Sequence, residues 1–390
     1  MHRFILMNSR SRNILATLSL TMLFACIKPF DPAIDSNAAN KYVVSGRVTN
    51  TEGWQAVGVS LSSPIESPEY IPVSSCQVTI ADDKGTMFPM EEYVPGLYRV
   101  WMRQLDLVPG TSYQVKVITP EGELLESGFD RMSTGPPIDS VYYRIEDIPT
   151  TGNGSRTVMQ FYVDLNAVGN YSQYYQWEIV ETWEYEAAHP VEFYYDGTFH
   201  EVKPPDYTNK VCWITQLVRN IFTVSTRSLS QNIYNHYPLQ TIDGTSSSRL
   251  GIMYSTLVRQ LALSEGAYNY WDELRINSNE LGGLYEKQPF AVKGNLVNLS
   301  SPDKDVLGYF YAAAETTRRY FYHDVEGIVL DYNRECYEQE LVPFFWRDVT
   351  PREYPIYYYY NESGALRILN LYCVDCRKQG GTTVKPVFWP

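Results

Sequence analysis

Short runs of alternating apolar and polar residues follow one another from residue 41 to residue 137. Runs with the two-residue period of half-buried strands occur at residues 42–49, 57–61, 76–81, 97–102 and 113–119. Turn sequences containing glycine or proline separate them, as at Gly85, Gly96 and Gly110, because glycine accepts positive φ angles and proline presets a corner. Short strands at this regular spacing predict an immunoglobulin-like β-sandwich over residues 41–137.

A larger β-rich domain is predicted over residues 138–390. Gly135, Pro136 and Pro137 form a stiff break, and a new alternating run begins at Ile138. Further strands, rich in aromatic residues, are predicted at residues 157–165, 174–185, 307–322, 327–330 and 356–360. The polar and aromatic stretch 189–209 is interpreted as a long loop or a hairpin.

A helical insertion interrupts this second domain. Ala267, Tyr270, Trp271 and Leu274 recur at spacings of three and four, which predicts a helix over residues 265–277 with Ser264 as its N-cap. A second short helix is predicted at residues 253–263. The chain as a whole is therefore predicted to be mainly β, with short helices near residues 253–277.

The first 25 residues have the layout of a secretory signal. Arg3, Arg10 and Arg12 precede an apolar run that is too short and too early for a spanning helix. The run ends in Ala25-Cys26, as in a bacterial lipoprotein signal, so we expect cleavage before Cys26 and acylation of this residue, which would anchor the protein stably. The alternative is an ordinary signal with a chance cysteine. Residues 26–40 are interpreted as a lipidated, flexible stalk.

Composition narrows the class of protein further. The 390 residues are 44% hydrophobic and 20% charged, which excludes a polytopic membrane protein and a disordered chain. The 33 tyrosines favour strands over helical bundles. The net charge is −13, and removal of the signal takes away three arginines and no acids. This acidity argues against nucleic acid as a partner.

Five cysteines remain beyond the lipidation site. Cys76 stands alone in the first domain, so we expect it to be a free, buried thiol. Cys212, Cys336, Cys373 and Cys376 all follow residue 200 and are predicted to form two disulfides, with three connectivities open. A redox pair or half a zinc site at Cys373 and Cys376 is the alternative, but no βαβ pattern surrounds them.

Signatures of catalysis are scarce. The sequence has no G-x-S-x-G, no H-E-x-x-H, no phosphate-binding glycine loop and no dinucleotide fingerprint. His189 and His200 lie near acidic residues, so a surface metal site is conceivable, although solvated loop residues are the interpretation we favour. A carboxylate pair for glycoside hydrolysis stays open, because any two acids can converge in space. No catalytic residue, metal or cofactor is predicted.

Aromatic residues cluster near the middle and the end of the chain. They could stack on sugar faces or grip a peptide, but we favour core packing and cross-strand pairs for most of them. The partner or ligand contacts that we consider are Tyr357, Tyr358, Tyr359, Tyr360, Phe388 and Trp389. Terminal segments fray unless something holds them, so we expect the tail to be pinned on its own domain or on another chain.

An ordered set of local sequences resembles one known family. It includes Cys26 with its stalk, Pro95-Gly96-Leu97-Tyr98, Pro136-Pro137-Ile138-Asp139-Ser140, Tyr268-Asn269-Tyr270-Trp271 and the ending around Cys373-Val374-Asp375-Cys376. Taken in order, these resemble the Bacteroidota outer-membrane lipoproteins catalogued as domain of unknown function number 4249. The resemblance implies a setting beside TonB-dependent transporters of the starch-utilisation type. It brings no catalytic residues with it.

Two functions are therefore expected from the sequence. The first is a non-enzymatic outer-membrane lipoprotein, an accessory subunit of such a TonB-dependent β-barrel transporter or of another outer-membrane assembly complex, acting in substrate capture or complex assembly. The second is a surface hydrolase of glycans or peptides with an unrecognised carboxylate pair. We expect the body at the cell surface, with the periplasmic face as the alternative.

Overall fold

The structure is a computed structural model that describes residues 41–64, 67–150, 154–279, 292–330 and 335–390. It is mainly β, as predicted. The predicted signal, Cys26 and the stalk lie outside these residues. Within the described part, no helix is long and apolar enough to cross a membrane.

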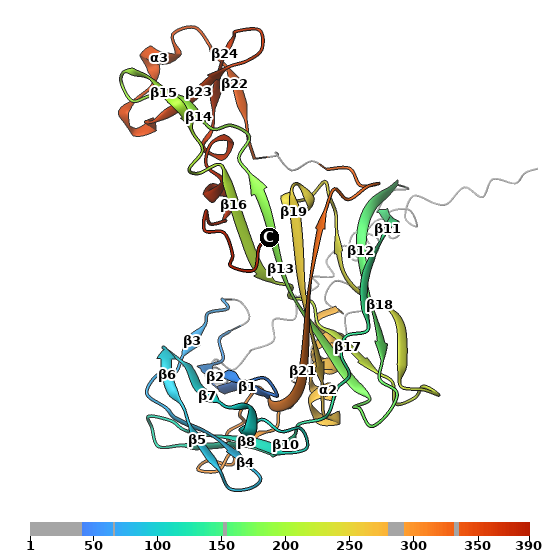
Figure 1. Ribbon diagram of the computed structural model, residues 1–390. Coiled ribbons are helices and arrows are strands. Elements are labelled where there is room, and N and C mark those ends of the chain that lie inside the picture. The colour runs from blue at the N-terminus through green and yellow to red at the C-terminus, as the bar shows by residue number, and fades with distance from the viewer. Residues whose placement is uncertain (1–40, 65–66, 151–153, 280–291, 331–334) are drawn as a thin grey trace, which may run out of the picture.

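One ten-stranded sheet extends through most of the molecule (Figure 1). Its strands are β1 (Tyr42–Thr49), β2 (Gly53–Leu61), β3 (Ile71–Pro72), β6 (Glu91–Val94), β7 (Leu97–Met102), β13 (Tyr174–Glu186), β16 (Val211–Leu217), β17 (Phe222–Ser225), β19 (Met253–Ala262) and β21 (Phe310–His323). Their main order is β16-β13-β19-β21-β1-β2-β7-β6, while β17 pairs with β13 and β3 pairs with β2. We call this the long sheet.

A parallel pair joins the two halves of the long sheet. β1 lies beside β21 with Gly46 opposite Phe310, whereas the other pairs of this sheet are antiparallel. Gly308, just before β21, has a φ of +93°, and a Cβ atom there would lie 2.1 Å from the Val44 carbonyl oxygen. Only glycine allows so close an approach of the two backbones.

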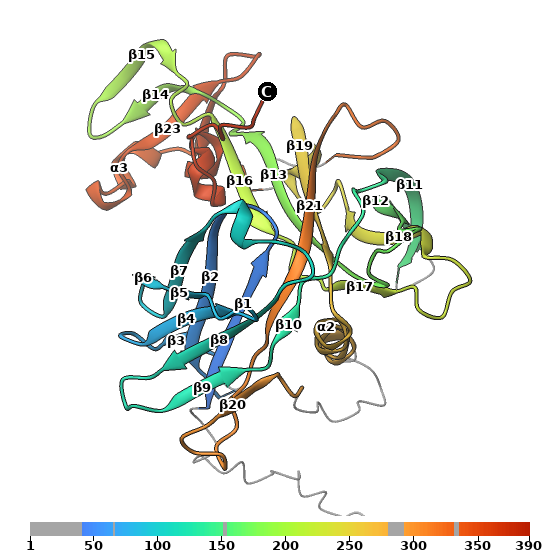
Figure 2. The same ribbon diagram turned by 60° about the horizontal axis from the view of Figure 1, so that its bottom comes forward.

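The first core lies between one half of the long sheet and a six-stranded sheet (Figure 2). The second sheet consists of β4 (Gln77–Asp82), β5 (Met87–Pro89), β8 (Ser112–Ile118), β9 (Leu124–Ser127), β10 (Asp130–Arg131) and β20 (Leu296–Asn298). Val48, Ile80 and Val115 are fully buried between them. Leu296 and Phe310 belong to the same core, so the chain returns to the first sandwich long after residue 137.

The second core lies between the other half of the long sheet and a three-stranded sheet. The three strands are β11 (Ser140–Thr150), β12 (Gly154–Asn166) and β18 (Ile233–Ile242). Phe161, Trp177 and Tyr254 are fully buried here. β21 contributes Phe310 to the first core and Tyr322 to the second core. These residues are an even number of positions apart, so their side chains lie on the same face of the strand. Both smaller sheets therefore cover the same face of the long sheet.

The helix α2 (Glu265–Asn279) lies on the opposite face of the long sheet. It confirms the predicted helix, and the Ser264 hydroxyl caps it by accepting a hydrogen bond from the Ala267 amide at 3.1 Å. The second predicted helix, at residues 253–263, is wrong. Residues 253–262 form β19, paired with β13 on one side and β21 on the other.

A small lobe projects from the end of the long sheet (Figure 1). Its five-stranded sheet has the order β15-β14-β23-β24-β22, formed by β14 (Val191–Tyr195), β15 (Phe199–Asp206), β22 (Glu338–Glu340), β23 (Ile356–Tyr360) and β24 (Leu366–Leu369). The short helix α3 (Phe345–Asp348) belongs to it. The predicted hairpin within residues 189–209 is confirmed by β14 and β15.

The strand predicted at residues 327–330 is wrong, because this segment forms a loop. Gly327 begins it with a φ of +82°, which breaks an extended backbone. The remaining helical turns are short 3₁₀ segments, η3 (Gln104–Asp106), η4 (Ser248–Leu250), η5 (Pro351–Glu353), η6 (Leu371–Cys373) and η7 (Cys376–Gln379).

The cysteines confirm the prediction of two disulfides and one free thiol. Cys212 on β16 is bonded to Cys376, and Cys336 is bonded to Cys373. Cys76 is free and buried. The first disulfide ties the C-terminal segment to the edge of the long sheet, and the second closes the base of the small lobe.

Candidate functional site

A groove of about 590 Å³ lies on the face of the long sheet that carries α2. Arg47 on β1, Glu178 on β13 and Arg259 on β19 line it, together with Tyr311 and Glu315 on β21. Further lining residues are Trp54 on β2 and Tyr270 and Trp271 on α2. β2 and β13 lie on opposite sides of β1 and β21 in the strand order, so the groove crosses the junction between the two halves of the sheet.

An ion pair crosses this junction. Both terminal nitrogens of Arg47 donate to the Glu178 carboxylate, with Nη2 at 2.8 Å from Oε2, and Nη1 also lies 3.2 Å from the Tyr311 hydroxyl. Burial alone would lower the pKa of Arg47, but Tyr311 and Glu178 outweigh it and raise this pKa. Burial also raises the pKa of Tyr311 to about 12. Arg47 and Glu178 are therefore committed to each other as a charged pair.

Two arginines on the same face have no carboxylate partner among the described residues. Arg259 lies opposite Thr317 on β21, and Arg319 lies opposite Leu257 on β19, which makes the arginines diagonal neighbours. Arg319 donates to the Ser255 hydroxyl at 3.0 Å. Burial, and then the charge of Arg259, lower the pKa of Arg319. Arg259 also lies opposite Glu178 on β13, whose carboxylate is bound to Arg47. The two arginines thus extend a row of positive side chains from the groove along the sheet.

An aromatic patch lies next to the groove on the outer face of the first sandwich. Trp54 and Trp101 are 49% and 51% exposed and pack edge to face, with ring centroids 5.6 Å apart. The Arg99 guanidinium lies 4.1 Å from the Trp54 ring centroid and 3.8 Å from that of Tyr93. Cation–π contacts with Arg99 hold the Trp54 and Tyr93 rings in place and cover one face of each, while both rings stay about half exposed.

The residues of this patch are not among the contacts predicted from the sequence. Trp101 falls inside the predicted strand 97–102, where Tyr98 and Met102 are buried on the other face. An apolar ring at an outward position of an alternating strand was the signal that could have revealed it.

The predicted contacts at Tyr357, Tyr358, Tyr359 and Tyr360 lie on β23 in the middle of the lobe sheet. Tyr358 is buried against Phe193, with ring centroids 5.3 Å apart, and the Tyr359 hydroxyl donates to Glu338 at 2.6 Å. Tyr357 is half-buried, whereas Tyr360 is 51% exposed. Packing within the lobe therefore occupies most of this row, and its role as a partner contact stays a prediction.

The other predicted contacts, Phe388 and Trp389, lie against the long sheet. Trp389 is 6% exposed, donates from Nε1 to Glu184 at 2.7 Å and packs edge to face on Phe321. The ring of Phe388 lies 3.6 Å from the Arg319 guanidinium. The tail is pinned on its own chain, on the same face as the groove.

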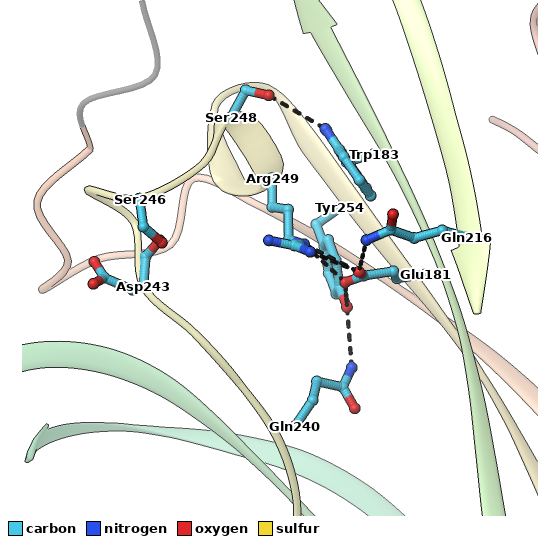
Figure 3. Close-up of polar contacts among 9 residues, drawn as sticks. All are labelled: Glu181, Trp183, Gln216, Gln240, Asp243, Ser246, Ser248, Arg249 and Tyr254. Carbon is cyan, nitrogen blue, oxygen red and sulfur yellow. Dashed lines mark hydrogen bonds and ion pairs between the residues drawn. The ribbon is translucent and has the colours of Figure 1, made fainter. Parts of the chain in front are cut away.

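A buried carboxylate in the second core is fully engaged (Figure 3). Glu181 is 2% exposed and accepts hydrogen bonds from Arg249 at 3.0 Å, from the Gln216 amide at 2.6 Å and from the Tyr254 hydroxyl at 3.1 Å. Burial raises the pKa of Tyr254 well above its usual value. Saturated in this way, Glu181 holds η4 against β13 and offers little to a substrate.

The two histidines considered for a metal site lie in separate contacts. His189 is 3.0 Å from Glu338, and the nearby Cys336 is bonded to Cys373 and so has no thiolate to offer. His200 lies 2.8 Å from Asp196 and stacks on Tyr194. Each of the two imidazoles therefore takes part in an ordinary surface interaction with a neighbouring carboxylate.

A family described as "Domain of unknown function (DUF4249)" matches residues 27–319. The match includes α2, every groove residue named above and both sandwiches except the last residues of β21, and it ends before β22, β23 and β24 of the lobe. No curated protein matches the chain. The match covers well over half of the sequence and agrees with the family resemblance of its local motifs, so this chain belongs to the DUF4249 family.

Proposed function

We propose that this chain is a non-enzymatic, lipid-anchored outer-membrane protein. It serves as an accessory subunit of a TonB-dependent transporter of the starch-utilisation type, or of another outer-membrane assembly complex, in substrate capture or complex assembly. The observation that carries the proposal is the aromatic patch of Tyr93, Trp54 and Trp101, which adjoins the groove on one continuous face.

Exposed rings of this kind favour a binding role. Trp54 and Trp101 are about half exposed although they lie on strands whose opposite face builds the first core. Tryptophan and tyrosine dominate the energetics of protein contacts, and clustered apolar surface on a soluble body marks an interaction site. The patch is held by strand pairing, so its rings lose little entropy on binding.

The predicted anchor fits such a role. Residues 27–40 could span at most about 50 Å when fully extended, which would keep the body close to a membrane-embedded partner. Tethering raises the effective concentration of the two proteins, so a modest patch is sufficient for a lasting complex.

Co-purification of full-length protein from gently solubilised cells tests the proposal. A variant carrying Tyr93→Ala and Trp101→Ala is compared with the wild type and with Tyr207→Ala, which removes an exposed ring in the connection between β15 and β16. We expect a TonB-dependent barrel to co-purify with the wild type and the control, and to drop about tenfold or more with the double variant. Absence of any such barrel from the wild type, or its undiminished recovery with the double variant, refutes the proposal.

One observation favours the alternative, a surface hydrolase. Glu178 and Glu315 both line the groove, and two acids across a cleft are the requirement for glycoside hydrolysis. Glu178 is bound by Arg47, which weakens the alternative. New reducing ends released from a glycan by the wild type, and lost in Glu315→Gln, would establish hydrolysis and displace the non-enzymatic proposal.

A further inference from the structure

Charges of both signs line the groove without a partner among the described residues. Arg259 and Glu315 are half-buried, and no side-chain hydrogen bond or ion pair within that part of the chain satisfies either. They lie on adjacent strands, since Glu315 is opposite Leu261 and Arg259 is opposite Thr317. Both side chains can be hydrated in the groove, so a ligand that displaces this water must offer each of them a hydrogen-bonding group.

Aromatic surface lies beside these charges. Trp54 presents a half-exposed ring at the β2 side, and Tyr270 and Trp271 lie at the α2 side. Tyr270 is held by Tyr309, with ring centroids 4.8 Å apart. The groove volume of about 590 Å³ falls within the usual range of small-molecule sites. Rings and hydrogen-bonding groups therefore border the same space.

The charge balance selects the chemistry of the ligand. Glu178 lies opposite Arg259 on the neighbouring strand but is bound to Arg47. Among the described lining residues, Arg259 is therefore the cation without an ion pair, and Glu52 and Glu315 are further acids of the groove. A strongly anionic ligand would meet the two acids, and a cationic ligand would meet Arg259. A neutral ligand whose adjacent groups both donate and accept hydrogen bonds satisfies the two signs together.

A vicinal diol on a pyranose ring has this property. One hydroxyl can donate to the Glu315 carboxylate while its neighbour accepts from the Arg259 guanidinium, both as charge-assisted hydrogen bonds. The C–H face of the same ring is apolar and packs on an aromatic side chain. We propose that the groove binds a neutral oligosaccharide, with Arg259 and Glu315 on its hydroxyl groups and Trp54 against a ring face.

This inference rests on the proposed role in substrate capture, and it is tested with detergent-solubilised full-length protein. The probes are short linear oligosaccharides of glucose, mannose, galactose and xylose. Polyuronate and short peptides represent the other ligand classes, and binding of each probe is measured by calorimetry. At least one neutral oligosaccharide should bind, and Arg259→Met, Glu315→Gln and Trp54→Ala should each weaken it by about tenfold or more.

Two matched controls accompany these variants. Arg318→Met removes an exposed arginine one position from Arg319 but on the other face of β21, where it lies 5.2 Å from the Tyr320 ring. Glu326→Gln removes an exposed acid in the following loop. Neither should change the affinity. Because Trp54 is at the surface, its variant stays informative if a substitution on the groove floor impairs folding.

The outcomes separate this inference from the proposed function. No binding of any neutral oligosaccharide, binding of polyuronate or peptide instead, or affinity unchanged in the three groove variants overturns the inference, even where the transporter still co-purifies. Oligosaccharide binding without a co-purifying transporter sustains the inference and refutes the accessory role alone.

Discussion

Asp130 is a carboxylate at the meeting point of both sandwiches and α2. It is 7% exposed, its Oδ1 accepts from the Ser264 hydroxyl at 2.5 Å, and its Oδ2 accepts from the Ala312 amide at 2.8 Å. Burial raises its pKa from 3.8 to about 6, although both hydrogen bonds act in the opposite direction. Between pH 3.8 and about 6, the Asp130 carboxyl group is therefore protonated in the folded state and ionised in the unfolded chain.

The first prediction concerns the pH dependence of stability at this residue. Because the pKa of Asp130 is raised in the folded state, this residue contributes fully to the unfolding free energy below pH 3.8. The contribution is lost as the pH rises through about 6. Two pKa units correspond to about 3 kcal/mol. Asp130→Asn should flatten the change in unfolding free energy between about pH 4 and pH 7 by this order, measured by urea unfolding. Identical pH profiles for wild type and variant would contradict it.

The second prediction concerns Cys76. The residue is 9% exposed, and burial raises the pKa of its thiol, so little reactive thiolate is present at neutral pH. A maleimide reagent should leave Cys76 unmodified in the native protein and label it fully in denaturant, as followed by intact mass. Labelling at equal rates in both conditions, or a bridged Cys76 in non-reducing peptide maps, would count against this assignment.

At the scale of elements, sequence patterns predict strands that have one buried and one exposed face. The predicted runs 42–49 and 97–102 coincide with β1 and β7. β19 lies in the middle of the long sheet, with the second core on one face and α2 nearby on the other. Its apolar positions therefore do not alternate, and their spacing in the sequence predicts a helix instead of a strand. Strands covered on both faces defeat a rule based on period.

The groove could not be predicted for a different reason. Arg47 and Glu178 are 131 positions apart in the sequence, and Arg47 and Tyr311 are 264 apart. Their proximity depends on the order of strands in the long sheet, which no local pattern encodes. The four disulfide cysteines, by contrast, are recognisable from residue type and location alone.

The third prediction concerns the C-terminal tail as an element. Trp389→Ala should lower the unfolding free energy by about 3 kcal/mol, because the side chain is buried and its hydrogen bond to Glu184 is lost. Val387→Ala is the matched control, since Val387 is fully exposed. Deletion of residues 384–390 should act like Trp389→Ala. If Trp389→Ala and the deletion were both as stable as the wild type, the tail would not be held on the long sheet as described.

At the scale of the whole molecule, we predict that Cys26→Ala abolishes lipid incorporation. The signal sequence predicts acylation of Cys26, and more than one acyl chain on this residue would anchor the body at a membrane. The variant should lose palmitate labelling and move from the membrane fraction to the soluble fraction, while Cys76→Ala should keep both properties. Labelling of Cys26→Ala at the wild-type level would refute lipidation at this residue.

The parallel pairing of β1 with β21 also constrains the order in which the protein can fold. Synthesis proceeds from the N-terminus, yet β1 has an open edge until residues 307–313 arrive to bond with it, as the Val44 amide does with the Leu307 carbonyl at 2.9 Å. Leu296 and Phe310 complete the first core only then. Such distant pairing slows folding and leaves an unpaired strand open to other chains. The nascent protein must be shielded until most of its length has emerged, so holdase chaperones should matter to its yield more than they do for a sandwich built from consecutive residues.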